Sequence, residues 1–406
     1  MYKGVDYLIK RKACLGCGLC IKQHYSGRMY LSESGYYYPS SNAPIDDKMK
    51  KYCPGYSITQ KRKKQTKEEL LYGPLVLPVM SGYITDKELN FKASSGGVIT
   101  ALLITLFREK MIDSVLQVRE SQKDPLKTEA FLSMSESDVM NCMGSRYAPC
   151  SLFENLDHYL NIGDRIAVVG KPCDIAALKA YMKVYPEKTK NIVYTFSMMC
   201  MGLPSYNATK ELVRFLGVDQ QHVEKLRYRG YGWPGKATIK TTNGNVKSCT
   251  YIQSWGAILG RDTLFRCKLC PNGFGEFADI TCGDAWHVKD GEPVFETDDN
   301  GKSLIFVRSE QGKQLLDKAI ANGILCVNNY NIKDLPLIQK SQFQRKKYLF
   351  GRYLLYRLLI SPTFRIQGFH LTRLLSTADM PSLWNDSRGF LGRWWRDYKG
   401  KKRNHG

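Results

Sequence analysis

The stretch RIAVVGKPCDIAALKAYMKVY (165–185), followed by NIVYTFSMMC (191–200), contains the pattern from which the fold can be predicted. RIAVVG is a short apolar run that ends in glycine, which is typical of a buried strand. A helical pattern follows it, and the second apolar run again precedes a helical pattern, LPSYNATKELVRFLG (203–217). Strands that alternate with helices indicate a parallel sheet with helices on its faces.

Further strand and helix patterns extend this unit. SSGGVITALLITLFREKMI (94–112) predicts a helix that starts with serine and glycine, and DSVLQVRE (113–120) and TEAFLSMS (128–135) predict strands. Between residues 223 and 307 the patterns indicate more strand and loop, without clear boundaries. We therefore predict an α/β core with a mixed, largely parallel sheet and flanking helices.

Length and composition are those of an ordinary globular protein with two or three domains: 406 residues, 43% hydrophobic and 24% charged. The first residues include lysine and arginine but no apolar run behind them, so we predict no secretory signal. The most apolar stretch, RYLLYRLLI (352–360), is broken by arginine and is too short to span a bilayer. We expect a cytoplasmic protein. In that reducing compartment thirteen cysteines indicate metal or redox chemistry rather than disulfides.

Three cysteines lie within seven residues in CLGCGLC (14–20), with the spacing C-x2-C-x2-C. Zinc sites usually present separated pairs, whereas this unbroken triple matches the loop that holds a 4Fe-4S cluster in bacterial ferredoxins. The fourth position of that run is His24, so the last ligand has to be a remote cysteine before proline, as in Cys53-Pro54. Structural zinc and unmetallated thiols are the alternatives. The spacing thus predicts a small N-terminal ferredoxin-like module whose 4Fe-4S cluster is held by Cys14, Cys17, Cys20 and Cys53.

A second set of cysteines is less obvious. Cys173 and Cys200 each follow a predicted parallel strand, at the edge where α/β sheets gather ligands. Cys267 and Cys270 form a C-x2-C pair that could close the site. The alternative is that Cys173 and Cys200 are small buried hydrophobic residues. The spacing leaves both possibilities open.

Several short motifs between residues 14 and 287 occur in a fixed order. They are CLGCGLC, SSGGVITALL, GSRYAP, VGKPCDIAAL, CMGLPS, RYRGYGWPG, FRCKLC and ADITCGDAWH. This series resembles the coenzyme F420 hydrogenase/dehydrogenase beta-subunit family, a group of flavin and iron-sulfur oxidoreductases. The family also includes a plant chlorophyll-derivative reductase and bacterial members associated with surface polysaccharide synthesis.

The resemblance implies a second 4Fe-4S cluster and an FAD. It assigns the second cluster to Cys173, Cys200, Cys267 and Cys270. It assigns FAD binding to Ser94, Ser95, Gly96, Gly97, Ser145, Arg146, Tyr147, Gly283, Asp284 and Trp286. The sequence departs from the common family pattern at His24 and at Cys282, where the residue before Gly-Asp is usually aliphatic. Neither position is a predicted ligand.

The residues support part of this assignment on their own. SSGG (94–97) places hydroxyls and amides at a helix N-terminus, which suits a pyrophosphate but also makes an ordinary helix cap. RYRGYGWPG (227–235) can stack on a flat ring, or it can be a packed loop. No G-x-G-x-x-G motif follows a strand, so a flavin has to be held in another way. His287 could donate a proton, but a lone histidine is more often packed or exposed, so no catalytic residue is assigned.

The resemblance implies an iron-sulfur flavoprotein oxidoreductase. Electrons would pass from ferredoxin or a similar carrier through two 4Fe-4S clusters to FAD and then to an organic substrate, with surface polysaccharide biosynthesis as one setting. Archaeal members imply an alternative in which coenzyme F420 is the substrate. A pure electron-transfer subunit without substrate chemistry is a further alternative. We expect no nucleic-acid binding, because the basic excess does not follow a recognition module.

The formal charge of +22 is concentrated toward the C-terminus, where residues 339–406 contain fifteen lysine or arginine residues and three aspartates. RGFLGRWWRDYKGKKR (388–403) interleaves aromatic and basic residues, which suits either peripheral membrane contact or packing onto the protein. We predict a ferredoxin-like 4Fe-4S domain, the N-terminal part of a flavin domain, its C-terminal part with the second cluster, and a basic, helical, aromatic tail. Their bounds are 1–72, 73–164, 165–335 and 336–406.

Overall fold

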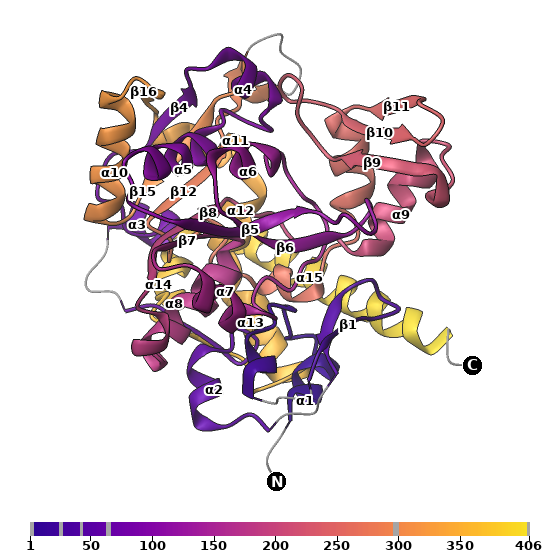
Figure 1. The fold of residues 1–406 in the computed structure, drawn as a ribbon. Helices are drawn as coiled ribbons and strands as arrows, with labels where there is room; N and C mark the ends of the chain where they lie inside the picture. Colours follow the sequence, from indigo (N-terminus) through magenta and orange to yellow (C-terminus); the bar gives the residue numbers. More distant parts are fainter. Residues whose placement is uncertain (1–3, 24–26, 41–43, 62–65, 295–299, 404–406) are drawn as a thin grey trace.

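An eight-stranded sheet runs through the middle of the computed structural model, which describes residues 4–403 except 24–26, 41–43, 62–65 and 295–299 (Figure 1). In spatial order its strands are β16 (Leu325–Asn329), β4 (Met80–Ile84), β15 (Ser303–Val307), β12 (Ile280–Asp284), β8 (Ile192–Met198), β7 (Ile166–Gly170), β5 (Ser114–Glu120) and β6 (Thr128–Ser133). The four strands β12, β8, β7 and β5 are parallel, and every other pairing is antiparallel. The sheet is mixed, as predicted, and its parallel part is limited to these four central strands.

Helices cover both faces of the sheet, as the alternating pattern predicts (Figure 1). One face carries α5 (Val98–Arg108), α6 (Glu136–Asn141) and α10 (Glu310–Ala321), whose apolar side chains form one core with the strands. The other face carries α7 (Leu156–Ile162) and α8 (Pro172–Val184). The central strands are buried on both faces, which explains their continuous apolar runs.

A second, three-stranded sheet lies beside the main one and consists of β9 (Val223–Arg227), β10 (Ala237–Thr241) and β11 (Val246–Cys249). It packs with α9 (Tyr206–Phe215) and a π-helical segment (Ile252–Leu259) around a core of its own. The sequence predicts strand and loop here but not a separate sheet, because the strands are short and partly exposed. The connecting regions also contain α4 (Lys87–Lys92) and the hairpin β13 (His287–Lys289) and β14 (Glu292–Val294).

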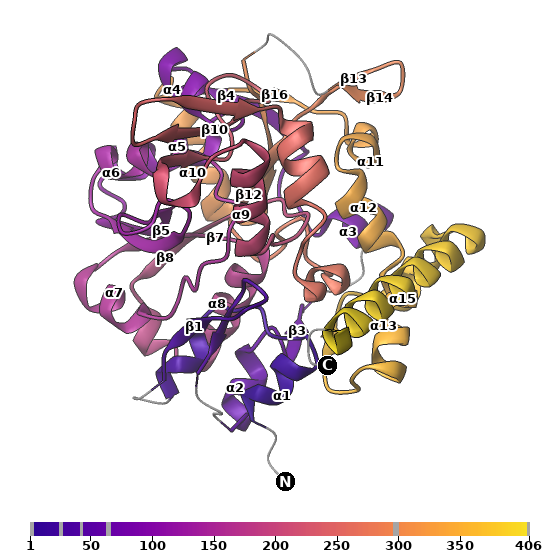
Figure 2. The same cartoon turned by 90° about the vertical axis from the view of Figure 1, so that its right-hand side faces the viewer.

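The N-terminal module lies under the α8 face of the sheet (Figures 1 and 2). It contains α1 (Val5–Lys10), a 3-10 helix η1 (Leu19–Gln23), the hairpin of β1 (Met29–Leu31) and β2 (Tyr37–Pro39), α2 (Asp47–Tyr52) and β3 (Ser57–Thr59). The next helix, α3 (Lys67–Tyr72), lies apart from this module, in a cluster with Trp286, Phe306 and Leu335. Helix α3 starts at a capping box in which Thr66 and Glu69 bond each other's backbone N–H groups. His24 and part of the basic stretch before α3 lie outside the described residues. The ferredoxin-like character of this module stays a prediction.

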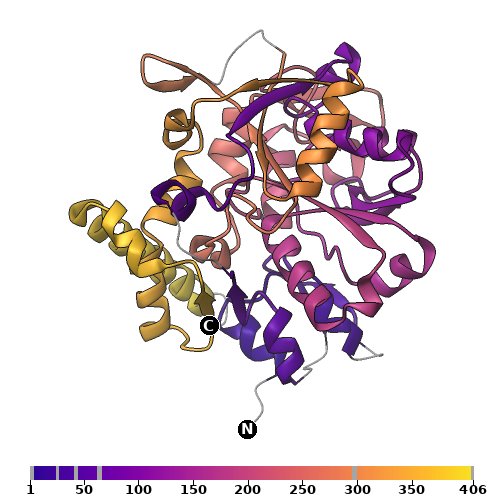
Figure 3. The ribbon, with the colours of Figure 1, turned by 90° about the vertical axis from the view of Figure 1, so that its left-hand side faces the viewer.

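The C-terminal region is folded onto the rest of the protein (Figures 2 and 3). It contains α11 (Leu335–Ile338), α12 (Lys340–Lys347), α13 (Leu349–Leu359), β17 (Arg365–Gln367), α14 (Leu371–Leu374) and α15 (Met380–Arg403). Strand β17 pairs in parallel with β3, and the buried ring of Phe390 packs against Phe265. This region is helical and basic, as predicted, but its apolar residues make it part of the fold.

Among the described helices, none combines the length and the apolar character needed to cross a membrane.

Candidate metal and cofactor sites

The first cysteine set lies in the N-terminal module. Cys14 and Cys17 lie in the loop after α1, Cys20 is in η1, and Cys53 is the C-cap of α2. Gly18 in this loop has a φ of +89°, and a β-carbon there would lie 2.6 Å from the backbone nitrogen of Glu154. Only glycine therefore lets the loop lie against the segment that precedes α7.

The four cysteines line one hollow of about 390 Å³, counted out to its open mouth. Burial raises the pKa of the Cys14 thiol to about 12, and the backbone N–H groups of Gly16 and Leu15 act against it. Burial also raises the pKa of Cys53, where the N–H groups of Gly55 and Tyr56 again lower it. Backbone N–H groups aimed at sulfur stabilise a thiolate, so the loops favour these thiols as metal ligands.

The second set lies at the carboxyl edge of the parallel strands. Cys173 is in the first turn of α8, after β7, and Cys200 follows β8. Cys267 is in a 3-10 helix, η5 (Phe265–Leu269), and Cys270 is its C-cap. The backbone N–H of Cys200 bonds the Gly273 carbonyl at 2.9 Å, so both cysteine-bearing loops are joined.

Packing also brings members of this second set together, because Cys173 packs against the apolar cluster that contains Cys267. Burial, together with the neighbouring Cys267 and Cys270, raises the pKa of Cys200 to about 12. The pKa of Cys173 is raised by burial and then by Asp174, with Cys200 and Cys267 adding to the effect. The N–H of Leu203 donates to the Cys267 sulfur at 3.4 Å. The structure therefore brings together all four cysteines that the resemblance assigns to this set.

In the described part of the chain, no three His, Cys, Asp or Glu side chains are placed to hold a single metal ion. A site for a single ion requires all ligands to reach one point, with sulfur about 2.3 Å from a zinc ion. A 4Fe-4S cube instead presents a separate iron to each of its four cysteines. The hollow lined by the first cysteine set, with its N–H donors, fits the separate iron positions of a cube better than a single ion.

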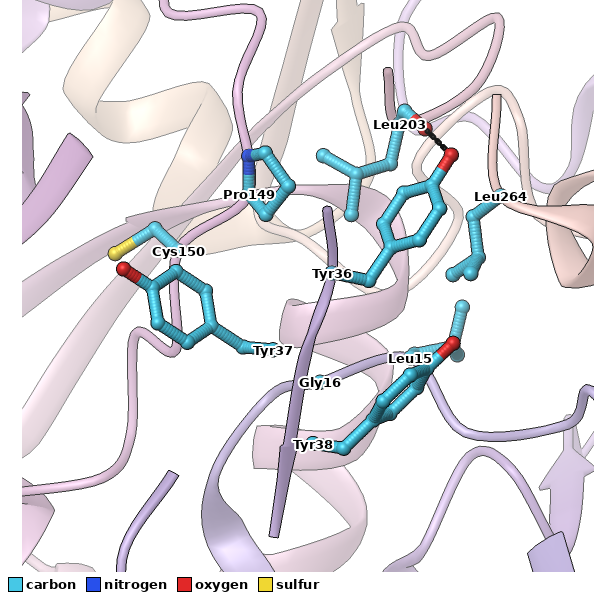
Figure 4. Close-up of a pocket in the computed structure, with 9 residues that line it drawn as sticks. All are labelled: Leu15, Gly16, Tyr36, Tyr37, Tyr38, Pro149, Cys150, Leu203 and Leu264. Carbon is cyan, nitrogen blue, oxygen red and sulfur yellow. Dashed lines mark hydrogen bonds between the residues drawn. The ribbon is translucent and has the colours of Figure 1, made fainter. Parts of the chain in front are cut away.

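The two cysteine sets are neighbours. The buried Arg266 guanidinium donates to the carbonyl of Pro54, next to Cys53, and to that of Leu269 in the second set's loop, at 3.3 and 3.0 Å. Leu15 of the first loop packs with Leu203 and Leu264 of the second-set loops. Figure 4 shows a cavity lined by these three leucines, where Tyr36, the residue before β2, donates to the Leu203 carbonyl. The sequence does not signal this role of Arg266, although it precedes Cys267 directly.

Several of the predicted FAD-binding residues meet on one side of the core. The Ser94 hydroxyl accepts a bond from the Ser145 N–H at 2.7 Å and donates to the Arg229 carbonyl at 3.3 Å. The buried Arg229 guanidinium bonds Asp284 at 2.8 Å and lies 5.2 Å from the Trp286 ring. Gly283 lies against Met199, whose sulfur would be 2.5 Å from a β-carbon there. The structure thus connects SSGG, the serine of GSRYAP, RYRGYGWPG and GDAW.

Other predicted contacts are occupied by the protein itself. The Ser95 hydroxyl donates to the Lys302 carbonyl, and the Gly96 N–H donates to Ser303. Helix α5 starts after Gly97 in the left-handed conformation and has no side-chain cap, so SSGG does not form the ordinary helix cap that was the alternative to an anion site. Its serine hydroxyls bond distant carbonyls instead.

Arg146 and Tyr147 also bond or pack within the protein. Arg146 donates to Glu120 and to the carbonyls of Leu226 and Lys127. Tyr147 packs 4.7 Å from the ring of Trp255. Their role in FAD binding stays a prediction.

Unsatisfied polar atoms provide a test of the flavin site. Within the described residues, Nη2 of Arg229, Oδ1 of Asp284 and Nε1 of Trp233 are buried without a hydrogen-bond partner. Buried groups of this kind are costly unless a ligand bonds them. The Trp233 ring stacks on Trp286 at 4.6 Å and 25°. RYRGYGWPG is therefore a packed loop that also presents free donors, and flavin binding at its edge stays a prediction.

The comparisons with known proteins agree with these motifs. Two profiles of the coenzyme F420 hydrogenase/dehydrogenase beta subunit match the chain, the N-terminal one over residues 79–157 and the C-terminal one over residues 163–333. The chain belongs to the coenzyme F420 hydrogenase/dehydrogenase beta-subunit family. The beta-subunit profiles end before α12, so the last helices lie outside them.

The chain is similar to several archaeal proteins. The coenzyme F420 hydrogenase subunit beta of Methanococcus voltae is 26% identical over 279 residues, 66% of this chain and 90% of that protein. The F420-dependent formate dehydrogenase subunit beta of Methanocaldococcus jannaschii is 25% identical over 63% of each chain. A chain of the F420-reducing [NiFe] hydrogenase complex from Methanosarcina barkeri has a TM-score of 0.53 at 23% identity, covering 67% of this chain and 89% of that chain. It shows the fold.

Proposed function

We propose that this beta-subunit family member is an iron-sulfur flavoprotein oxidoreductase with two 4Fe-4S clusters and one FAD. Membership of a family of oxidoreductase subunits supports the electron-transfer role. The observation that carries the proposal is the convergence of eight cysteines into two adjacent sets. When bound, the clusters would transfer single electrons and the flavin could also transfer a hydride.

The chain's own residues hold, orient and shield these groups. Eight thiols at Cys14, Cys17, Cys20, Cys53, Cys173, Cys200, Cys267 and Cys270 supply the metal ligands in the proposal. Leu15, Leu203 and Leu264 pack in one buried apolar cluster with Cys267. Arg229 and Asp284 supply a buried donor and acceptor beside Trp286, where the polar edge of a flavin would bind. No described residue is assigned as proton donor.

The relatives' names favour one alternative partner. They refer to coenzyme F420 in a hydrogenase, a formate dehydrogenase and a sulfite reductase. Our main proposal is that ferredoxin or a similar carrier is the donor and an organic molecule, such as a precursor of surface polysaccharide, is the acceptor. The alternative is that coenzyme F420 is the substrate. Several relatives are named as subunits, which supports a further proposal, that other protein chains bind to this one.

Anaerobic mixing with each donor separates the two proposals. We expect reduced ferredoxin to bleach the flavin absorbance of the reconstituted protein, and to do so more slowly at high salt, because a basic protein attracts an acidic carrier. Bleaching by reduced coenzyme F420 alone would replace ferredoxin with the alternative. Protein that releases no flavin on acid precipitation would instead be an electron-transfer subunit without substrate chemistry.

We also propose that α15 contacts an anionic membrane surface. Trp384 and Trp395 are 66% and 52% exposed and lie three turns apart on one face, with the exposed Arg388 between them. The opposite face is buried through Phe390. Exposed tryptophan and arginine suit the headgroup region of a bilayer.

Vesicle flotation tests this contact without removing the folded C-terminal region. We expect the full chain to float with vesicles rich in anionic lipid, and the double substitution Trp384→Ser and Trp395→Ser to reduce the bound fraction several-fold. Phe215→Ser, at an exposed aromatic residue of α9, is the matched control. Equal flotation of both variants would show that α15 is not the contact.

A further inference from the structure

Three buried basic side chains of the C-terminal helices face the second cysteine set. Arg345 and Lys346 are on α12 and Arg352 is on α13, and each is less than 9% exposed. These helices lie beyond residue 333, where the family profile ends. Lysine and arginine are almost never buried unless they are paired, so the partners of these three residues need an explanation.

Arg345 bonds both loops that carry the second set. Its Nη2 donates to the Cys200 carbonyl at 2.6 Å, and its Nη1 donates to the carbonyls of Met201 and Cys267 at 2.5 and 3.3 Å. A β-carbon at Gly273 would lie 2.8 Å from Nη2, so that glycine leaves room for the guanidinium. One side chain thus joins two loops that are 67 residues apart in the sequence.

The other two basic residues bond the same loop but are neutralised. Lys346 donates to the Pro271 carbonyl and to Glu276, both at 2.6 Å. Arg352 donates to the Lys268 carbonyl at 3.0 Å and forms a two-pronged ion pair with Asp386. Each of these cations therefore has a carboxylate beside it.

Arg345 differs from Lys346 and Arg352. Among the described residues its guanidinium bonds only backbone carbonyls, and its Nε is buried without a hydrogen-bond partner. A buried charge without a counter-charge is costly. Two of the three carbonyls that it bonds belong to Cys200 and Cys267 themselves, so the guanidinium lies against the backbone of two cysteines of the second set. The positive charge is therefore suited to thiolates that are deprotonated by metal binding.

We propose that Arg345 is a positioning residue of the second cysteine set, which ties the Cys200 and Cys267 loops together and compensates the charge of their metal-bound thiolates. The inference rests on the proposed function for its metal, but the tie between the loops is independent of it. It makes the C-terminal helices part of this site. A nearby cation also stabilises the more negative, reduced form of a bound cluster and so raises its reduction potential.

Alkylation of the iron-free full chain tests the tie. In Arg345→Gln we expect Cys200 and Cys267 to react with iodoacetamide at least tenfold faster than in the unsubstituted protein, as followed by mass spectrometry. Cys14 and Cys17 should keep their rates and so report that the fold is intact. Arg357→Gln, at an exposed arginine of α13 that bonds only Tyr353 among the described residues, is the matched control. Unchanged rates at Cys200 and Cys267 would overturn the proposal.

Arg345→Lys keeps the charge but cannot bond all three carbonyls in the same fork geometry. If the glutamine variant fails to fold, faster alkylation of Cys200 and Cys267 alone in the lysine variant supports the tie, and wild-type rates overturn it.

After reconstitution, the reduction potential of the second cluster should fall in Arg345→Gln and recover in Arg345→Lys. Equal potentials in the unsubstituted protein and both variants would overturn the charge role. Absence of a second cluster from the unsubstituted protein would instead contradict the proposed function, while the alkylation rates still decide the tie.

Discussion

Replacing Cys17 or Cys267 by alanine is expected to lower the iron content of the anaerobically reconstituted protein from about eight to about four atoms per chain. Each substitution removes one ligand from one set and leaves the other set intact. Cys17 lines the hollow of the N-terminal module, and Cys267 lies in η5 beside Cys270. A cube that loses one of four thiolates has an exposed iron and is lost or degraded during purification.

The control for these variants is Cys249→Ala, at a buried cysteine of β11 outside both sets. It should keep the full iron content. The double variant with both Cys17 and Cys267 replaced should hold almost no iron, because each of the two sets then lacks one ligand. Iron loss of equal size in Cys249→Ala would show that cysteine burial, rather than ligation, determines the result.

Replacing Arg229 by leucine is expected to abolish FAD retention and to lower the free energy of unfolding by about 3–5 kcal/mol. The guanidinium is 2% exposed, bonds Asp284 at 2.8 Å and the Pro234 carbonyl at 2.6 Å, and lies 4.8 Å from the Tyr251 ring. Leucine leaves the Asp284 carboxylate without its cation and removes the free Nη2 donor. Denaturant unfolding and the fluorescence of acid-released flavin measure the two effects.

Arg165→Leu is the matched control, because Arg165 pairs with Asp113 at 2.7 Å but both side chains are exposed. Its loss should cost less than about 1 kcal/mol and leave the flavin bound. The single substitution Asp284→Asn should also weaken flavin retention, since it replaces one carboxylate oxygen by an NH2 donor and removes the charge that pairs with Arg229. If Arg229→Leu keeps a full complement of FAD, the flavin is held elsewhere.

Much of the core is predictable because its signals are local. The run at 165–170 predicts β7 almost to the residue, and the helix after it ends one residue before the predicted end. Strands β7 and β8 are buried on both of their faces, so their apolar runs are continuous. The small sheet of β9 to β11 could not be predicted in this way, because β11 is exposed along most of its length and has no clear alternation.

In the candidate site, too, local features could be predicted from the sequence and long-range contacts could not. Cysteine spacing predicts the first set, since three of its members come from one loop. It could not predict Arg345, which acts on Cys200 across 145 residues of sequence through the packing of α12. Likewise, SSGG predicts a capped helix, but the Ser94 and Ser95 hydroxyls bond the carbonyls of Arg229 and Lys302, which only the tertiary fold brings near. The sequence of the basic C-terminal region leaves membrane contact and packing onto the protein both open, because charge is visible in a sequence and its burial is not.

The most direct test of the account is the metal and sulfide content of the anaerobically purified and reconstituted chain. We predict about eight irons and about eight acid-labile sulfides per chain, without stoichiometric zinc. The sulfide count matters because thiol sites that bind loose iron would give metal without it. Stoichiometric zinc in place of iron, or iron without sulfide, would contradict the assignment of both cysteine sets to 4Fe-4S clusters.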